Sequence, residues 1–218
     1  MKITYIKHYK SSIKKINFPQ NIITRIFLSK FSPLKKNFKN KKILDYSCGS
    51  GPYLNFLKLL NFDIYASEIS LQITSRLNKR INGVKFIISN NKKIDLPKNY
   101  INYFFSIHSI YYLQNKNESL ELVFNEILRV LKKDGYLICT FLKKKQSYLK
   151  FLKEKKNLYK IIFDKYKIRQ GSYIHLFENK NQIIKYFSKK FKIIEIGEYK
   201  SNFNNLDENY FICIFKKK

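Results

Sequence analysis

Residues 42–51 read KILDYSCGSG and decide the fold of this 218-residue chain. The first half, residues 42–46, is a short, mostly apolar run that predicts a strand, and the second half is a turn that contains Gly49 and Gly51. The segment after the turn, residues 52–60, carries apolar residues at a spacing that fits a helix. Because a helix N-terminus presents backbone N–H groups and the positive end of its dipole, this arrangement predicts a ligand site at the turn.

The alternation of strand and helix continues outward from this turn. Apolar runs predict further strands over residues 62–66, 84–88, 101–107 and 136–141, and helical periodicity predicts helices over residues 70–81 and 118–131. Strands that alternate with helices in this way form parallel βαβ units with right-handed crossovers. The chain is therefore predicted to fold as a doubly wound α/β sheet.

The last part of the chain departs from this alternation. A helix is predicted over residues 177–187, and two strands follow over residues 192–199 and 210–215. The polar segment 200–209 joins these strands. Because this connection is short and contains no helix, the two strands are predicted to be antiparallel.

Two lysine-rich segments accompany the predicted sheet. Residues 1–40 are basic and aromatic, and the apolar residues within 22–27 fit one or two turns of an amphipathic helix. We therefore predict an N-terminal helical lid over residues 1–40 and a single main domain over residues 41–218. Within that domain, residues 143–176 are predicted as a surface-exposed cap or insertion, with weak helical periodicity over residues 143–167.

Two nucleotide-binding motifs are disfavoured at the turn. The dinucleotide fingerprint GxGxxG, read from Gly49, places Leu54 where the third glycine allows close packing of helix on strand. The Walker pattern GxxxxGK(S/T) is absent from the sequence. A nicotinamide cofactor and the hydrolysis of a nucleoside triphosphate are therefore not expected.

The run 43–51 resembles motif I of class I S-adenosylmethionine-dependent methyltransferases, an acidic residue followed by GxGxG, with Ser47 in place of the first glycine. Serine is small enough for that place if its φ stays negative. Four later segments are similar to further motifs of the family, in the same order: FDIYASEIS at 62–70, SNN to DLP over 89–97, INYFFS at 101–106 and EILRVLKKDGY at 126–136. The resemblance implies a Rossmann-like, mostly parallel, seven-stranded sheet with an antiparallel final strand, and S-adenosylmethionine as the cofactor.

The resemblance also implies which residues hold the cofactor. Asp45 would receive the amino group of the methionine moiety, Glu68 would accept hydrogen bonds from both ribose hydroxyls, and Asn90 would meet the adenine amine. Gly49 and Gly51 would let the backbone approach the cofactor. The other residues expected at this site are Ser47, Cys48, Ile69, Asn91 and Ser106.

Two histidines are candidates for removing a proton from the methyl acceptor. The resemblance places methyl transfer at the carboxyl end of the strand 101–107, and His108 follows that strand directly. His175, in the predicted cap, is the second candidate. Because a sulfonium makes the methyl group electrophilic, transfer is expected by direct displacement.

The net charge of +29 comes mostly from lysine, which provides 39 of the 44 basic residues against 15 acidic ones. Lys, Asn, Ile, Phe and Tyr make up 128 of the 218 residues. These amino acids share A/T-rich codons, so the charge indicates a nucleotide bias in the encoding genome rather than a polyanion partner.

The three cysteines lack CxxC spacing and predict neither disulfides nor a metal site. No apolar segment reaches the length of a membrane span, and the N-terminus has no apolar signal region. We therefore expect a cytoplasmic protein.

The methyl acceptor is expected to be a small molecule. No extra RNA-binding domain is visible, and residues 106–109 read SIHS where base N-methylating enzymes carry NPPY or DPPY. An RNA or protein methyltransferase that holds a polyanion on its lysine-rich segments is an alternative, as is a non-catalytic methyltransferase-like binding protein. The sequence predicts neither the acceptor atom (O, N or C) nor the oligomeric state.

Overall fold

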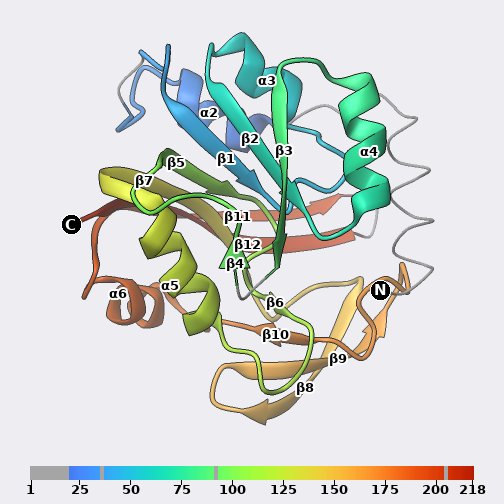
Figure 1. Cartoon of the computed structure of the whole chain (residues 1–218). Helices are drawn as coiled ribbons and strands as arrows, with labels where there is room; N and C mark the ends of the chain where they lie inside the picture. The colour runs from blue at the N-terminus through green and yellow to red at the C-terminus, as the bar shows by residue number, and fades with distance from the viewer. Residues whose placement is uncertain (1–19, 35–36, 91–92, 204–205) are drawn as a thin grey trace.

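The computed structural model describes residues 20–34, 37–90, 93–203 and 206–218 (Figure 1). Its main element is an eight-stranded sheet in the order β11–β12–β7–β5–β1–β2–β3–β4. These strands are β1 (Lys42–Tyr46), β2 (Asp63–Glu68), β3 (Val84–Asn90), β4 (Lys93–Ile94), β5 (Ile101–Ser106), β7 (Leu131–Leu142), β11 (Phe191–Phe203) and β12 (Leu206–Lys217).

Most of this sheet is parallel. β7, β5, β1, β2 and β3 run in one direction, and β12 runs antiparallel between β7 and β11. This confirms the predicted doubly wound sheet with an antiparallel final strand. After β1 the chain builds one side of the sheet through β2 and β3 and then crosses to the other side at β5. Ligands of such sheets bind where the strand order reverses, here at the carboxyl ends of β1 and β5.

Helices cover both faces of the sheet (Figure 1). One face carries α2 (Asn21–Leu28), α3 (Leu54–Leu59) and α4 (Leu71–Arg80), and the other carries α5 (Leu120–Val130) and α6 (Lys180–Phe187). Each face has its own cluster of buried apolar side chains. Within the described ranges, no helix is both long enough and apolar enough to cross a membrane.

The helix predicted in the N-terminal lid is α2, and it belongs to the helical layer over the sheet. Ile23 and Phe27 are buried, and the Phe27 ring centroid lies 5.9 Å from that of Phe105 and 6.0 Å from that of Phe62. Residues 1–19 of the predicted lid lie outside the described residues.

The helical periodicity proposed for residues 143–167 is wrong, because this segment forms strands. A second sheet has the order β6–β10–β9–β8, with β6 (Tyr112–Leu113), β8 (Leu149–Lys155), β9 (Leu158–Asp164) and β10 (Tyr173–His175). β9 pairs antiparallel with β8 on one side and with β10 on the other. The backbone hydrogen bonds of this segment therefore run between strands and not along a helix.

Two predicted loops are also partly strand. The polar segment after β3 contains β4, which pairs antiparallel with β3 and adds an eighth strand to the predicted seven. The predicted loop 200–209 is mostly hairpin, because the pairing of β11 with β12 continues from Lys200 opposite Asn209 to Phe203 opposite Leu206. The last two strands are therefore longer than predicted.

Candidate active site

The glycine turn after β1 is attached to the end of β2. The N–H of Cys48 donates to the carbonyl of Ser67 at 2.9 Å, and the N–H of Ser47 donates to the Ser67 hydroxyl at 3.3 Å. The N–H of Gly51 closes the turn by donating to the carbonyl of Cys48 at 2.9 Å. The turn is thus fixed at the carboxyl edge of two neighbouring parallel strands.

Three residues of this turn have a left-handed backbone. The φ angles are 56° at Ser47, 56° at Gly49 and 74° at Gly51. The expectation that Ser47 keeps a negative φ is wrong, because the sharp exit from β1 requires the left-handed region whichever residue stands there. A backbone of this kind costs a non-glycine residue about 1–2 kcal/mol.

Gly51 also allows two helices to pack on the turn. A Cβ at this position would lie 2.9 Å from Cδ1 of Leu54 in α3 and 3.2 Å from Cδ2 of Leu77 in α4. The structure therefore gives Gly51 a packing role. Close approach of a cofactor to Gly49 and Gly51 stays a prediction.

Asp45 presents a buried carboxylate at the end of β1. Its side chain is 2% exposed, and Oδ2 has no hydrogen-bond partner in the part of the chain that the structure describes. Burial, and to a smaller extent the negative charge of Glu68, raises the pKa of Asp45 to about 8. The Asp45 carboxyl therefore keeps its proton at neutral pH, and a ligand that brings a positive charge would favour its ionised form.

Glu68 lies at the end of β2, next to Asp45 and the glycine turn. It is 1% exposed, its Oε2 accepts a hydrogen bond from the N–H of Gly49 at 3.1 Å, and its Oε1 accepts one from the N–H of Ile69 at 2.8 Å. The structure thus brings together three predicted cofactor residues, Asp45, Glu68 and Gly49. They come from two strands and one turn of the sequence.

Apolar side chains border this pair of carboxylates. Ile69 is 39% exposed and Leu71 is 62% exposed, although both follow a buried strand. An exposed apolar rim beside a buried carboxylate suits a ligand with a flat apolar part and a polar part. Ile69 was predicted at the cofactor site, and the neighbouring Leu71 was not.

The predicted adenine contacts are described only in part. Asn90 ends β3, where its backbone pairs with Lys93 of β4. The Asn90 side chain and the whole of Asn91 lie outside what the structure describes. Their roles stay predictions.

Ser106 ends β5 on the other side of β1, and its hydroxyl is engaged within the protein. The side chain is fully buried and hydrogen-bonded to the hydroxyl of Ser109, which donates to the carbonyl of Tyr46 at 3.1 Å. This chain of hydrogen bonds links the ends of β1 and β5. Ser106 therefore shapes the crevice from within, and a direct contact with a cofactor stays a prediction.

His108 follows β5 and has a left-handed backbone, with φ 58°. Its N–H donates to the hydroxyl of Thr140 at 2.8 Å, and its Nδ1 lies 3.5 Å from the hydroxyls of Thr140 and Tyr111. The ring meets that of Tyr210 edge-on, with centroids 4.7 Å apart. Burial, and to a smaller extent the positive charge of Arg169, lowers the pKa of His108 to about 4. The imidazole is therefore uncharged at neutral pH.

His175 lies in β10 and has different neighbours. Its ring centroid is 4.8 Å from that of Phe177 and 5.9 Å from that of Tyr186. Its Nε2 is buried and has no hydrogen-bond partner among the described residues, and burial lowers its pKa to about 4. The N–H of His175 donates to the carbonyl of Tyr111 at 2.8 Å. Tyr111 thus lies between the two candidate histidines, whose rings share no contact within the described residues.

Arg169 was not singled out from the sequence, yet the structure brings it to this region. Asp164 is 1% exposed and accepts hydrogen bonds from the N–H groups of Ile168 at 3.0 Å and Arg169 at 2.7 Å, which fixes the loop. The guanidinium of Arg169 lies 4.5 Å from the ring centroid of Tyr112. A signal for Arg169 was present, because it is the single arginine of the lysine-rich segment 143–176.

The sequence of this region matches a known family. Residues 44–139, from β1 to β7, match the family model described as a methyltransferase domain. In sequence, this segment resembles a methyltransferase domain. No curated protein matches the chain in sequence.

Solved structures of low sequence identity share the fold of this chain. A S-adenosylmethionine-dependent methyltransferase from Methanosarcina mazei aligns with a TM-score of 0.64 and 14% identity, over 92% of this chain and 98% of that one. The 1,6-didemethyltoxoflavin-N1-methyltransferase from Burkholderia thailandensis, solved with 1,6-didemethyltoxoflavin and S-adenosylhomocysteine, aligns with a TM-score of 0.62 and 10% identity, over 83% and 72%. The cyclase SpnF aligns with a TM-score of 0.66 and 14% identity, over 98% and 93%.

These comparisons confirm the resemblance to class I S-adenosylmethionine-dependent methyltransferases and the fold that it implies. Because a cyclase shares this fold, the fold does not by itself define the reaction. The roles of single residues stay predictions.

Proposed function

We propose that this protein binds S-adenosylmethionine and transfers its methyl group to a small-molecule acceptor. The observation that carries the proposal is the buried Asp45 carboxyl, whose Oδ2 has no partner among the described residues, beside Glu68 at the end of the next strand. The donor set fits this cofactor, which offers an ammonium and two ribose hydroxyls to carboxylate oxygens.

The proposal gives each residue of the cofactor edge a task. Asp45 accepts hydrogen bonds from the amino group of the methionine moiety, and Glu68 accepts them from the ribose hydroxyls. Ile69 borders the adenine, and Asn90 and Asn91 meet its polar edge. The turn residues Ser47, Cys48, Gly49 and Gly51 place backbone N–H groups beside the cofactor, and Ser106 supports the crevice between β1 and β5.

When bound, the cofactor supplies an electrophilic methyl group on a sulfonium. The protein then has to hold the acceptor in line with that methyl group. One of its side chains also has to take up the proton that the acceptor loses. His108 is the preferred residue for the proton, because its imidazole is uncharged at neutral pH and it follows the carboxyl end of β5. His175 is the second candidate for the proton, because its buried Nε2 has no hydrogen-bond partner among the described residues.

Calorimetric titration with S-adenosylhomocysteine tests the cofactor site. The wild-type protein is expected to bind, and Glu68→Ala is expected to bind at least about tenfold more weakly, because each lost hydrogen bond to a charged group is worth about 1.5–3 kcal/mol. Lys79→Gln, on the exposed side of α4, is the control and is expected to bind like the wild type. Absence of binding by the wild type, or equal binding by Glu68→Ala, contradicts the proposal.

A labelled-methyl assay tests the acceptor class. The protein is incubated with labelled S-adenosylmethionine and either a metabolite extract or total RNA. Label is expected in the small-molecule fraction. Label in RNA or in protein instead would overturn the small-molecule acceptor while leaving methyl transfer in place.

A further inference from the structure

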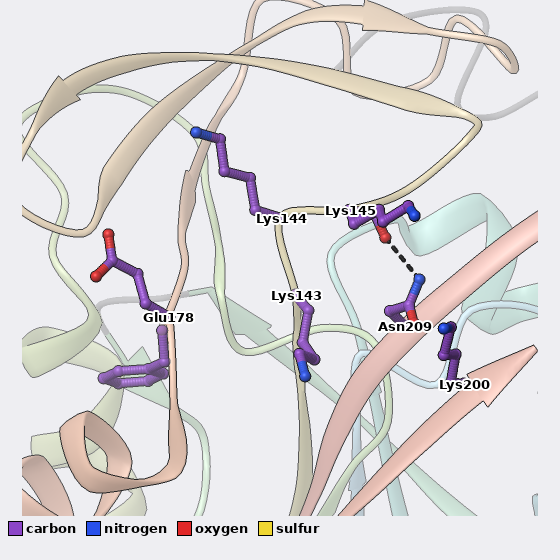
Figure 2. Close-up of a pocket in the computed structure, with 7 residues that line it drawn as sticks. Lys143, Lys144, Lys145, Glu178, Lys200 and Asn209 are labelled. Carbon is purple, nitrogen blue, oxygen red and sulfur yellow. Dashed lines mark hydrogen bonds between the residues drawn. The ribbon is translucent and has the colours of Figure 1, made fainter.

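A pocket of about 440 Å³ opens where the chain leaves β7 (Figure 2). We call it the lysine pocket, and its lining residues are Lys143, Lys144, Lys145, Phe177, Glu178, Lys200 and Asn209. They come from the end of β7, the segment before α6, and the facing strands β11 and β12. None of these residues was predicted at the active site.

Two amide side chains fix the backbone that carries three consecutive lysines. Asn209, 6% exposed, donates from Nδ2 to the carbonyl of Lys145 at 2.8 Å, the dashed line in Figure 2. Gln146 donates from Nε2 to the carbonyl of Lys143 at 2.9 Å and accepts from the N–H of Asn209 at 3.3 Å. The N–H of Lys143 donates to the carbonyl of Asn209 at 3.0 Å. The backbone of the three lysines is thus fixed, and the side chains of Lys143 and Lys144 point in different directions (Figure 2).

The carboxylates around the lysine pocket do not balance its positive charge. Glu198 is already paired with Lys143, whose ammonium lies 2.8 Å from Oε2. Glu178 lines the pocket, but in Figure 2 it stands on the other side from Lys145 and Lys200. No ion pair of the described residues includes the ammonium of Lys145 or of Lys200. Both ammonium groups are therefore available to an anion.

The lysine pocket and His108 lie at the same edge of the sheet. Lys143 directly follows the carboxyl end of β7, and His108 follows the carboxyl end of β5, which pairs parallel with β7. On β12, Asn209 and Tyr210 are neighbours whose side chains point to opposite faces of the sheet, so the pocket lies on the other face from the contact of the Tyr210 ring with His108, where the centroids are 4.7 Å apart. On β7, Thr140 accepts the hydrogen bond from the N–H of His108 and precedes Lys143 by three residues, which is about 10 Å of extended chain. A molecule that occupies both places would pass over this carboxyl edge of the sheet.

We propose that the lysine pocket binds the anionic end, a phosphate or a carboxylate group, of the molecule that is methylated. This inference rests on the proposed methyltransferase function and names its substrate class. A lysine ammonium is a compact charge that binds both kinds of anion, so the two share the same recognition chemistry. A small molecule is favoured over a polyanion because the lysines line a pocket of ligand size instead of an extended stripe.

Thermal shift with inorganic phosphate and with citrate tests the binding step at constant ionic strength. Each anion is expected to raise the melting temperature of the full-length protein. The double variant Lys145→Gln/Lys200→Gln is expected to need about tenfold more anion for the same shift. Lys79→Gln/Lys192→Gln removes the same charge from exposed positions outside the pocket and is expected to behave like the wild type. If both double variants respond equally to the anions, the anions bind through diffuse surface charge only, and the proposed anion site in the lysine pocket is wrong.

Methyl transfer tests the link to the acceptor. A metabolite extract is divided by anion exchange, and labelled product is expected from the retained, anionic pool. At limiting acceptor, Lys145→Gln/Lys200→Gln is expected to form about tenfold less product than wild type, with unchanged binding of S-adenosylhomocysteine. Product from the unretained pool, equal product from the variant, or no product from either pool contradicts the inference. The binding of S-adenosylhomocysteine by the wild type is measured separately. If the wild type binds it, the proposed cofactor site stands even when the inference about the lysine pocket fails.

Discussion

At Ser47 the chain places a side chain where the turn requires a left-handed backbone, with φ 56°. Glycine has no Cβ and adopts this conformation without strain, although it loses more entropy on folding. Ser47→Gly is therefore expected to raise the free energy of unfolding by about 0.5–1 kcal/mol in urea. Ser188→Gly, at a residue with φ −61°, is the control and is expected to leave stability unchanged or lower it. A loss of stability in Ser47→Gly would contradict the backbone strain that we infer at Ser47.

Asp45 has a pKa that rises from 3.8 to about 8 on folding, because it is buried beside Glu68. The folded state therefore binds more protons than the unfolded state between about pH 4 and pH 8, and stability falls as the pH rises through this window. Asp45→Asn carries no charge and is expected to lack this loss. Its free energy of unfolding should exceed that of the wild type at pH 8 and approach it near pH 4.

Urea unfolding at several pH values checks this expectation for Asp45. Asp95→Asn, at an exposed position, serves as the control and is expected to follow the wild type. A difference between Asp45→Asn and the wild type that stays constant from pH 4 to pH 8 would mean that the carboxyl does not titrate in this window.

At the residue scale, the sequence predicts which residues stand at the ends of the strands better than it predicts their backbone conformation. Asp45 and Glu68 are found together because parallel strands end at one edge, which follows from the strand and helix pattern. The left-handed φ of Ser47 depends on the path of the whole turn. The approach of Arg169 to the His108 region depends on a loop 61 residues away along the chain, which no local pattern contains.

At the scale of elements, the loop after β9 depends on one buried carboxylate. Asp164 is 1% exposed and accepts hydrogen bonds from the N–H groups of Tyr166, Ile168 and Arg169. Asparagine keeps a single acceptor oxygen, so at least one buried N–H loses its partner. Asp164→Asn is expected to lower the free energy of unfolding by about 1–3 kcal/mol.

Trypsin offers a second readout of this loop, because Arg169 becomes a cleavage site when the loop opens. Cleavage after Arg169 should be faster in Asp164→Asn than in the wild type. Glu154→Gln, an exposed position on β8, is the matched control and should show neither effect. Unchanged cleavage in Asp164→Asn would mean that the loop is held by other contacts.

The elements that the sequence predicts correctly are those with a local signal. β1, β5 and α5 follow from apolar runs and helical spacing, and the structure ends them within two residues of the prediction. The second sheet was missed because lysines interrupt the apolar residues of β8 and β9, and because β10 pairs with β6, which follows β5 far earlier in the chain. The hairpin of β11 and β12 was predicted too short, because its polar outer part is stabilised by pairing and not by burial.

At the scale of the whole molecule, the charge of +29 opposes folding, because folding brings like charges together. The Debye length falls from about 30 Å at 0.01 M salt to about 8 Å at 0.15 M, so salt screens most of this repulsion. Raising sodium chloride over that range is expected to stabilise the protein by about 1 kcal/mol, which corresponds to about 2–4 °C in melting temperature.

Two charge variants separate this repulsion from other salt effects. Lysines 79, 153, 156 and 192 are exposed and have no ion pair within the described residues. Replacing the four by Gln removes four charges and should reduce the salt-dependent rise in melting temperature. Replacing the same four by Arg keeps the charge and should leave the rise unchanged. If both variants respond to salt like the wild type, the excess lysine does not limit stability, and its effect is confined to places such as the lysine pocket where the backbone concentrates it.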